Sequence, residues 1–266
     1  MLTVLAPGPL STVQDRGRIG WASIGVPRSG TADRAAAALA NRLVGNQPSA
    51  AVLEVTAGGL RLRAERTVLV AVTGAPAPLV VDGRAAPLNA PVTLHPGAEL
   101  ALGLPAVLGS RSTDTLSGLG PAPLRAGDVL PIGTLAADEP IVDVAAVRPP
   151  ASRPVLRVLP GPRRDWLEAA AWTTLTSAEW TVTADSNRVG LRLSGPRLSR
   201  AREDELPSEG LVPGALQVPP DGAPVLFLAD HPVTGGYPVL AVVATADLPA
   251  IAQLRPGDVL RFKAAR

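Results

Sequence analysis

The sequence predicts a mainly β protein with a few short helices, built from two related β-barrels in tandem. Proline and glycine, 29 and 26 of the 266 residues, recur at short intervals and leave little room for long helices. Many pieces between them are apolar runs of strand length, a spacing that favours a barrel or a sandwich. A turn motif that occurs near the end of each half indicates a duplication.

The expected elements follow from local patterns. One helix is predicted over residues 31–44, an Ala/Leu-rich run for which Thr31 or Ser29 is the expected N-cap. A second helix is predicted over about 163–175, and a short third turn over 247–253. The clearest predicted strands are the apolar runs 67–73, 77–82, 155–159, 224–229 and 238–244.

The duplication is visible in two turn motifs. Residues 124–130 (Leu-Arg-Ala-Gly-Asp-Val-Leu) closely match 254–260 (Leu-Arg-Pro-Gly-Asp-Val-Leu), and 94–100 is a looser third copy. A strand that enters a Pro-Gly turn is also predicted near the start of each half, over residues 4–9 and 158–162. Each half thus begins and ends alike, which predicts two related domains.

The domain boundaries follow from a change in composition. Residues 145–154 are rich in proline and polar side chains, as linkers often are. We therefore expect one barrel domain over residues 1–147 and a second over 155–266, joined by a linker at about 148–154.

Several kinds of chemistry are excluded by missing residue types. Without cysteine there is no disulfide or cysteine-based metal site, and His95 and His231 are too few for a three-histidine zinc site, so no metal is expected. The only lysine, Lys263, lies in the terminal tail. This argues against a Walker loop, a Schiff base, a Ser–Lys amidase and a biotin attached to this chain. Acid–base chemistry then falls to carboxylates.

Charge and hydropathy predict a cytoplasmic protein that binds neither nucleic acid nor membrane. The net charge is +2, and the arginines are interleaved with acids rather than gathered in a basic block with aromatics. No stretch approaches the length of a membrane span. The N-terminal residues have neither the basic start nor the apolar run of a signal peptide.

Five segments place polar residues among glycines in a way that core strands do not require. Arg28 and Arg111 stand out because a guanidinium binds carboxylates and phosphates through two hydrogen bonds. Glu209 and Gln217 stand out because small residues beside them let a ligand approach. The five segments are residues 12–18, 25–33, 109–114, 207–219 and 230–238.

In this order, the five segments resemble the C subunit of bacterial 5-oxoprolinase. This family is also called KipA-like or allophanate hydrolase subunit 2, and it shares the carboxyltransferase domain of biotin-dependent urea carboxylase. The resemblance covers essentially the whole chain, but the stretch between Leu100 and Leu108 is shorter than is usual in the family. Further matching phrases are residues 39–46, 53–56, 126–131 and 205–210.

The resemblance implies two cyclophilin-like β-barrels and a role in a heteromeric hydrolase. That enzyme opens 5-oxoproline to glutamate with ATP. This chain would act with the A and B subunits of the same complex, pair tightly with the KipI-like B subunit, and be inactive alone. ATP would bind in the complex at a site that no motif of this chain locates.

The same resemblance, taken with the charges, suggests site residues. Opening a lactam requires a group that binds a carboxylate and an acid–base carboxylate nearby. Glu209 and Asp15 are the catalytic candidates. The candidates for binding the small carboxylate or amide substrate are Arg28, Ser29, Arg111, Ser112, Thr113, Gln217, Thr234 and Tyr237.

Two other functions remain open, because one scaffold can serve several roles. The first is a carboxyltransferase component of a biotin-dependent urea or amide carboxylase, which predicts activity that avidin abolishes. The second is a non-enzymatic KipA-like antagonist that sequesters a KipI-like inhibitor of a kinase, which predicts tight binding to the KipI-like partner without turnover.

Overall fold

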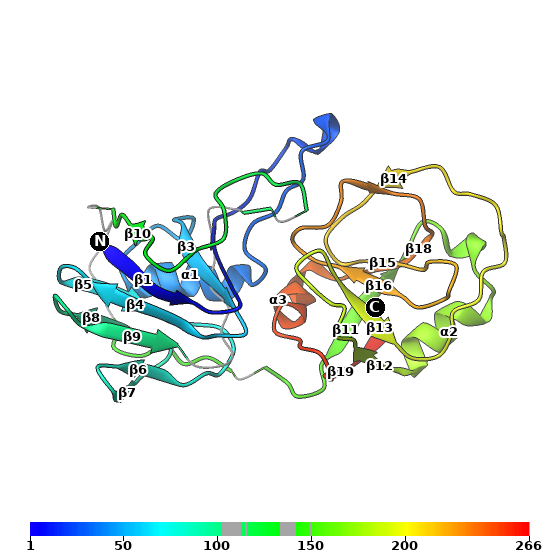
Figure 1. Cartoon of the computed structure of the whole chain (residues 1–266). Helices are drawn as coiled ribbons and strands as arrows, with labels where there is room; N and C mark the ends of the chain where they lie inside the picture. The colour runs from blue at the N-terminus through cyan, green and yellow to red at the C-terminus, as the bar shows by residue number, and fades with distance from the viewer. Residues whose placement is uncertain (103–112, 115, 134–141, 149, 266) are drawn as a thin grey trace. The chain divides into compact units, whose positions relative to one another are not determined.

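The computed structural model describes residues 1–102, 113–114, 116–133, 142–148 and 150–265 (Figure 1). Arg111 and Ser112, and most of the shortened stretch between Leu100 and Leu108, lie outside these ranges. The chain divides into two compact units. The first comprises residues 1–17, 33–114 and 118–149, and the second comprises 18–32, 115–117 and 150–266.

This division is not a simple cut along the sequence. The second unit resumes at residue 150, inside the predicted linker, but residues 18–32 also group with it. The sequence predicts a single boundary in the linker, and such a boundary does not separate residues 18–32 from the first unit.

The first unit is built on an antiparallel sheet. Six strands form it in the order β10-β1-β4-β9-β6-β7, while β2–β3 and β5–β8 are separate pairs. Along β4, Leu60, Leu62 and Ala64 are buried whereas Arg61 and Arg63 are exposed, the alternation of a strand with one face on a core. The strands are β1 (Leu2–Pro7), β2 (Leu10–Gln14), β3 (Val52–Thr56), β4 (Leu60–Ala64), β5 (Val68–Ala71), β6 (Leu79–Val81), β7 (Arg84–Ala86), β8 (Pro91–Leu94), β9 (Glu99–Leu102) and β10 (Val129–Leu130).

The one long helix described in this unit is α1 (Arg34–Leu43). It begins after Asp33, whose carboxylate accepts a hydrogen bond from the Ala36 N–H at 2.9 Å. The expectation that Thr31 or Ser29 caps the helix is therefore wrong. Asp33 has the extended backbone that an N-cap requires, and a cap acts only on the N–H groups two or three residues ahead of it.

The second unit is a closed seven-stranded barrel in the order β11-β18-β15-β16-β13-β12-β19. It closes through the parallel pair β11–β19. Trp180, Leu216, Leu226 and Phe262 are fully buried in its core. The strands are β11 (Val155–Pro160), β12 (Glu179–Val182), β13 (Gly190–Ser194), β15 (Ala215–Gln217), β16 (Val225–Phe227), β18 (Val239–Val243) and β19 (Val259–Ala264). The prediction of a mainly β protein with few short helices is confirmed.

The helices of this unit are shorter than predicted. Instead of one helix over 163–175, a 3₁₀ turn η2 (Arg164–Trp166) is followed by α2 (Ala170–Ser177). The break lies at Leu167, which is extended and forms a β-bridge with Arg200. Tertiary pairing thus overrides the local helical pattern. The predicted turn at 247–253 is present as η3 (Thr245–Asp247) and α3 (Leu248–Ile251).

The repeated turn has the same hydrogen bonds in both units. The Asp128 carboxylate accepts from the Arg125 N–H at 2.8 Å, and Asp258 accepts from Arg255 at the same distance. The glycine of each turn has a φ of 91°, a left-handed conformation that disfavours other residues. Each turn then enters a strand. The repeated turn therefore folds alike in both units. Two barrels were expected, but among the described residues only the strands of the second unit close into a barrel, and those of the first form an open sheet with two separate strand pairs.

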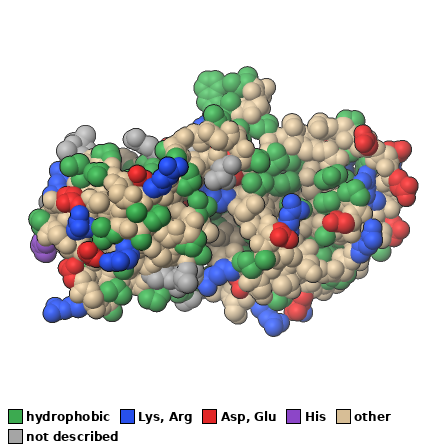
Figure 2. Space-filling view, viewed as in Figure 1, with side chains coloured by type: hydrophobic (Ala, Val, Ile, Leu, Met, Phe, Trp, Pro, Cys, Tyr) green, Lys and Arg blue, Asp and Glu red, His purple; other side chains and the backbone are tan. Residues whose placement is uncertain are grey.

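The described part of the chain carries neither a membrane-spanning helix nor a metal-binding cluster. None of its helices combines the length and apolarity needed to cross a membrane. Within the same residues, His, Asp and Glu form no group of three that could hold a metal ion. Lys and Arg alternate with Asp and Glu over the visible face rather than gathering in a block (Figure 2).

Candidate functional site

Two of the predicted polar segments meet on the second unit. The short strands β14 (Glu209–Gly210) and β17 (Thr234–Gly235) pair antiparallel, with Glu209 opposite Gly235. They form a small sheet of their own beside the barrel sheet. This pairing brings Glu209 and Thr234, both predicted site residues, to one place.

Glu209 is held by an arginine that the sequence analysis did not select. Arg163 lies between β11 and η2, and its Nε donates to both carboxylate oxygens of Glu209, at 2.8 and 2.9 Å. Its Nη2 donates to Oε1 as well. The side chains are 38% and 29% exposed, so the pair lies at the surface but is partly covered. Such a two-pronged contact fixes orientation as well as charge.

This contact sets the protonation of the carboxylate. The hydrogen bond from Arg163 holds the pKa of Glu209 below its ordinary value, against a smaller opposing effect of burial. Glu209 is therefore ionised at neutral pH and accepts hydrogen bonds. Because a lowered pKa weakens a carboxylate as a general base, the geometry suits Glu209 to orienting a group better than to removing a proton.

A buried amide lies against the same small sheet. Gln217, at the end of β15, is only 4% exposed, and its Nε2 donates to the Tyr237 carbonyl at 2.9 Å. A Cβ added to Gly235 would lie 2.7 Å from that Nε2. A larger residue at this position would therefore displace the Gln217 amide. The Tyr237 side chain is 46% exposed and Thr234 is exposed, so the outer side of the cluster is open to solvent.

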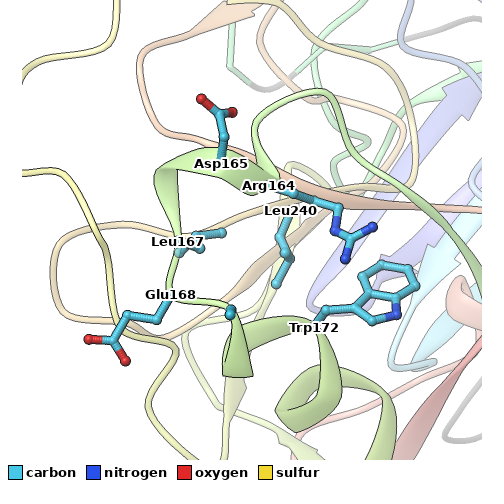
Figure 3. Close-up of a pocket in the computed structure, with 7 residues that line it drawn as sticks. Arg164, Asp165, Leu167, Glu168, Trp172 and Leu240 are labelled. Atoms are coloured by element: carbon cyan, nitrogen blue, oxygen red, sulfur yellow. The ribbon is translucent and has the colours of Figure 1, made fainter.

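The residues that follow Arg163 along the chain line a pocket of about 360 Å³ (Figure 3). The Arg164 guanidinium lies 4.6 Å from the centre of the Trp172 ring, and Figure 3 shows it stacked beside the indole. The carboxylates of Asp165 and Glu168 point away from this stack (Figure 3). The pocket is lined by Arg164, Asp165, Leu167, Glu168, Ala169, Trp172 and Leu240.

Ser29, a predicted substrate-binding residue, is instead fully buried in the second unit. Its hydroxyl donates to Asp230 Oδ1 at 2.6 Å, and Asp230 is paired with Arg188. Arg188 also donates to the Gly30 carbonyl at 2.7 Å. The Ser29 hydroxyl is thus engaged in a buried hydrogen bond, and its substrate contact stays a prediction. Its neighbour Arg28 is partly buried, and its substrate contact stays a prediction.

Asp15 and Thr113 lie in the first unit. The Asp15 carboxylate accepts from the Gly17 N–H at 2.8 Å, which closes a local turn. Thr113 is buried, and its hydroxyl donates to the Pro121 carbonyl at 2.8 Å. Its own carbonyl accepts from Gln14 Nε2 at 2.9 Å. A catalytic role for Asp15 and a substrate role for Thr113 stay predictions.

The cluster around Glu209 thus gathers four of the predicted residues, Glu209, Gln217, Thr234 and Tyr237. Sequence reasoning missed Arg163, Arg188 and Asp230. A signal existed for Arg163, since it directly follows the Pro-Gly-Pro turn that repeats in both halves. The partly exposed Arg163–Glu209 pair offers hydrogen-bond donors and an ionised acceptor at the surface, a combination that suits a small polar molecule.

Comparisons with known proteins agree with this architecture. The chain is 34% identical to the C subunit of 5-oxoprolinase from Escherichia coli, over 98% of this chain and 90% of that protein. It is 31% identical to the urea amidolyase of Lachancea kluyveri, over 97% of this chain but 16% of that protein.

Solved structures extend the comparison. The crystal structure of TTHA0988 superposes with a TM-score of 0.87 at 34% identity, over 98% of this chain and 55% of that one. The urea amidolyase of K. lactis gives a TM-score of 0.85 at 29% identity, over 98% of this chain and 18% of that one. The chain thus spans about half or less of these solved proteins. Residues 24–264 match the family described as carboxyltransferase domain, subdomain A and B. The chain therefore belongs to that family.

Proposed function

We propose that this chain is the C subunit of a cytoplasmic, ATP-dependent 5-oxoprolinase that opens 5-oxoproline to glutamate together with the A and B subunits. The proposal rests on the 34% identity to the corresponding E. coli protein, which extends over 90% of that protein. In the urea amidolyases the matching part is a small fraction of a larger chain. A near full-length match to a separate subunit favours the oxoprolinase role.

The proposed substrate fits the chemistry of the Glu209 cluster. 5-Oxoproline carries one carboxylate and one lactam amide. Because Arg163 holds Glu209 through Nε and Nη2, the ionised Glu209 suits the lactam N–H as a hydrogen-bond acceptor, and the remaining N–H groups of the partly exposed guanidinium suit the carboxylate or a phosphate. In the proposed reaction ATP would transfer its γ-phosphoryl group to the lactam oxygen and leave as ADP. Water would then add to the ring carbonyl carbon, and the C–N bond would break as the nitrogen takes up a proton, which leaves the new carboxyl group as an acyl phosphate. A second water would release inorganic phosphate and give glutamate. The nucleotide belongs to the complex, since no motif of this chain carries it.

Reconstitution with each subunit omitted in turn tests the proposal. The complete complex is expected to hydrolyse ATP in a manner that depends on 5-oxoproline and to form glutamate. Glu209→Gln is expected to lower kcat/KM by at least about 10-fold, because it removes the charge that meets Arg163 and the substrate. Glu179→Gln, in an exposed ion pair on the same barrel, is the matched control. Full activity without this chain would overturn the proposal.

A second role, as the carboxyltransferase component of a biotin-dependent urea or amide carboxylase, is favoured by the family match and by the similarity to urea amidolyases. Biotin would then be carried by another chain, because Lys263 is the only lysine here. Avidin separates the two roles, since it is expected to abolish carboxylase activity and to leave oxoprolinase activity unchanged. Stable binding to the KipI-like partner without any turnover would favour the non-catalytic antagonist.

A further inference from the structure

The pocket between η2 and α2 occurs where the helix predicted over 163–175 is interrupted (Figure 3). Leu167 is extended and bridges to Arg200, and the Glu168 N–H donates to the Ser199 carbonyl at 3.0 Å. These two contacts hold the stretch between η2 and α2 in place, beside a hollow of about 360 Å³. This volume lies within the range of small-molecule sites.

The floor of the pocket is apolar and belongs to the barrel. Leu167 and Leu240 line it, and both are packed in the hydrophobic core of the second unit. Leu240 lies in β18, a strand of the closed sheet. Ala169 and Trp172 add further apolar surface near the start of α2. Such a floor takes up the uncharged body of a ligand, because covering it removes apolar area from water.

The positive charge of the pocket is the guanidinium of Arg164, which is stacked on Trp172 at 4.6 Å from the ring centre (Figure 3). Stacking uses the face of the planar group and leaves the N–H groups at its edge to donate. Within the part of the chain that the structure describes, no hydrogen bond or ion pair engages these groups, whereas the neighbouring Arg163 is held by Glu209. A stacked guanidinium is pre-organised, so it loses little conformational entropy when it binds a ligand.

Two carboxylates also line the pocket, but they are not directed at this guanidinium. Asp165 pairs with Arg202 at 3.2 Å, which offsets its charge. Figure 3 shows the carboxylates of Asp165 and Glu168 pointing away from the stack of Arg164 and Trp172. An anion beside the indole therefore meets a guanidinium, with both carboxylates directed elsewhere.

We propose that this pocket binds a small organic anion, a carboxylic acid with a flat apolar body. The carboxylate accepts two hydrogen bonds from Arg164, and the apolar body covers Leu167 and Leu240. An inorganic anion would leave the floor uncovered, and a neutral ring would leave the guanidinium without an acceptor. Arg163 and Glu209 do not line this pocket, and the proposal does not depend on the proposed function.

Benzoate is the probe, titrated into the full isotope-labelled chain and followed by nuclear magnetic resonance at the Trp172 indole N–H. This signal is identified by its loss in Trp172→Leu. We expect a dissociation constant on the order of 1 mM, as is usual for so small a ligand. Acetate lacks the ring, benzyl alcohol lacks the charge, and benzylamine has the opposite charge. Each of these three is expected to bind at least about 5-fold more weakly than benzoate.

A substitution at Arg164 tests the assignment of the anion-binding group. Arg164→Gln is expected to raise the dissociation constant for benzoate at least about 10-fold, because it removes the charge and the two-pronged contact. Arg192→Gln changes an exposed arginine of β13 that does not line the pocket, and it is the matched control. It is expected to change the dissociation constant less than about 2-fold. Urea unfolding of both variants checks that the fold is intact.

Several outcomes would overturn the proposal. One is a Trp172 signal that does not shift with benzoate up to about 10 mM. Another is tighter binding of benzylamine than of benzoate, which would show that Asp165 and Glu168 set the charge preference. Equal binding of benzoate and benzyl alcohol, or of benzoate and acetate, would remove the charge or the floor from recognition. Wild-type affinity of a folded Arg164→Gln would exclude Arg164 as the anion-binding group.

Discussion

The buried ion pair between Arg188 and Asp230 is expected to be the most sensitive polar contact of the second unit. Asp230 is 0% and Arg188 only 7% exposed in the side chain. Asp230 accepts from Arg188 Nε at 2.8 Å, from Arg188 Nη2 at 3.1 Å and from the Ser29 hydroxyl at 2.6 Å. Asp230→Asn keeps the shape of the side chain but removes the charge and turns one acceptor into a donor.

The structure sets the size of the effect. After the substitution the guanidinium of Arg188 stays buried and loses the charge of Asp230, and breaking a buried pair in this way costs about 3–5 kcal/mol. Because asparagine retains one acceptor oxygen, we expect the lower end, about 3 kcal/mol. The control is Glu179→Gln on the same barrel, where the carboxylate is 41% exposed and pairs with Arg153 and Arg261. Exposed pairs contribute about 0–1 kcal/mol.

Urea unfolding followed by tryptophan fluorescence measures the difference. All four tryptophans lie in the second unit, so the signal reports on its unfolding: Trp21, Trp166, Trp172 and Trp180. The change in the free energy of unfolding follows from the shift in midpoint and the slope of the transition. A loss below about 1 kcal/mol for Asp230→Asn, or one equal to that of Glu179→Gln, would refute the reasoning.

Two further predictions concern the same unit. Arg163 holds the pKa of Glu209 below its ordinary 4.5, so the pair stabilises the fold above about pH 4.5 and this contribution is lost as the pH falls through the lowered pKa. Glu209→Gln should therefore flatten the acid limb of unfolding free energy against pH; an unchanged limb contradicts this. A Cβ on Gly161 would lie 2.2 Å from the Val239 carbonyl oxygen, so Gly161→Ala should cost at least about 2–3 kcal/mol in urea unfolding. Gly257 has a φ of 91°, and a Cβ added there would meet no atom within 4 Å, so Gly257→Ala should cost only about 1 kcal/mol. Equal losses of unfolding free energy in the two glycine variants would contradict the steric argument.

The sequence by itself determined the features that depend on neighbouring residues. Frequent glycine and proline and short apolar runs predict a mainly β chain. The repeated turns at 124–130 and 254–260 are readable because glycine supplies the left-handed backbone and aspartate accepts from the N–H three residues before it. The lack of cysteine excluded disulfides and cysteine-based sites without a structure. The single lysine was expected in a terminal tail, but Lys263 lies in β19 of the barrel, opposite Arg157 of β11.

Part of the Glu209 cluster was also predictable. Glu209, Gln217, Thr234 and Tyr237 lie in polar, glycine-rich segments that core strands do not need, and the structure brings them together on the second unit. Their partner Arg163 was not recognised as a site residue, because its place after the repeated Pro-Gly-Pro turn does not show that it faces a carboxylate 46 residues away.

Only the tertiary structure decided the contacts between distant positions. Pairing of Leu167 with Arg200 divides the predicted helix in two, and Asp33 rather than Thr31 caps α1. Ser29 lies 201 residues from Asp230, yet their side chains meet in a buried hydrogen bond. A local pattern reports the preference of a few residues for a strand, turn or helix. Which side chains then meet depends on how the closed sheet and its loops bring remote segments together, and that information is spread over the whole chain.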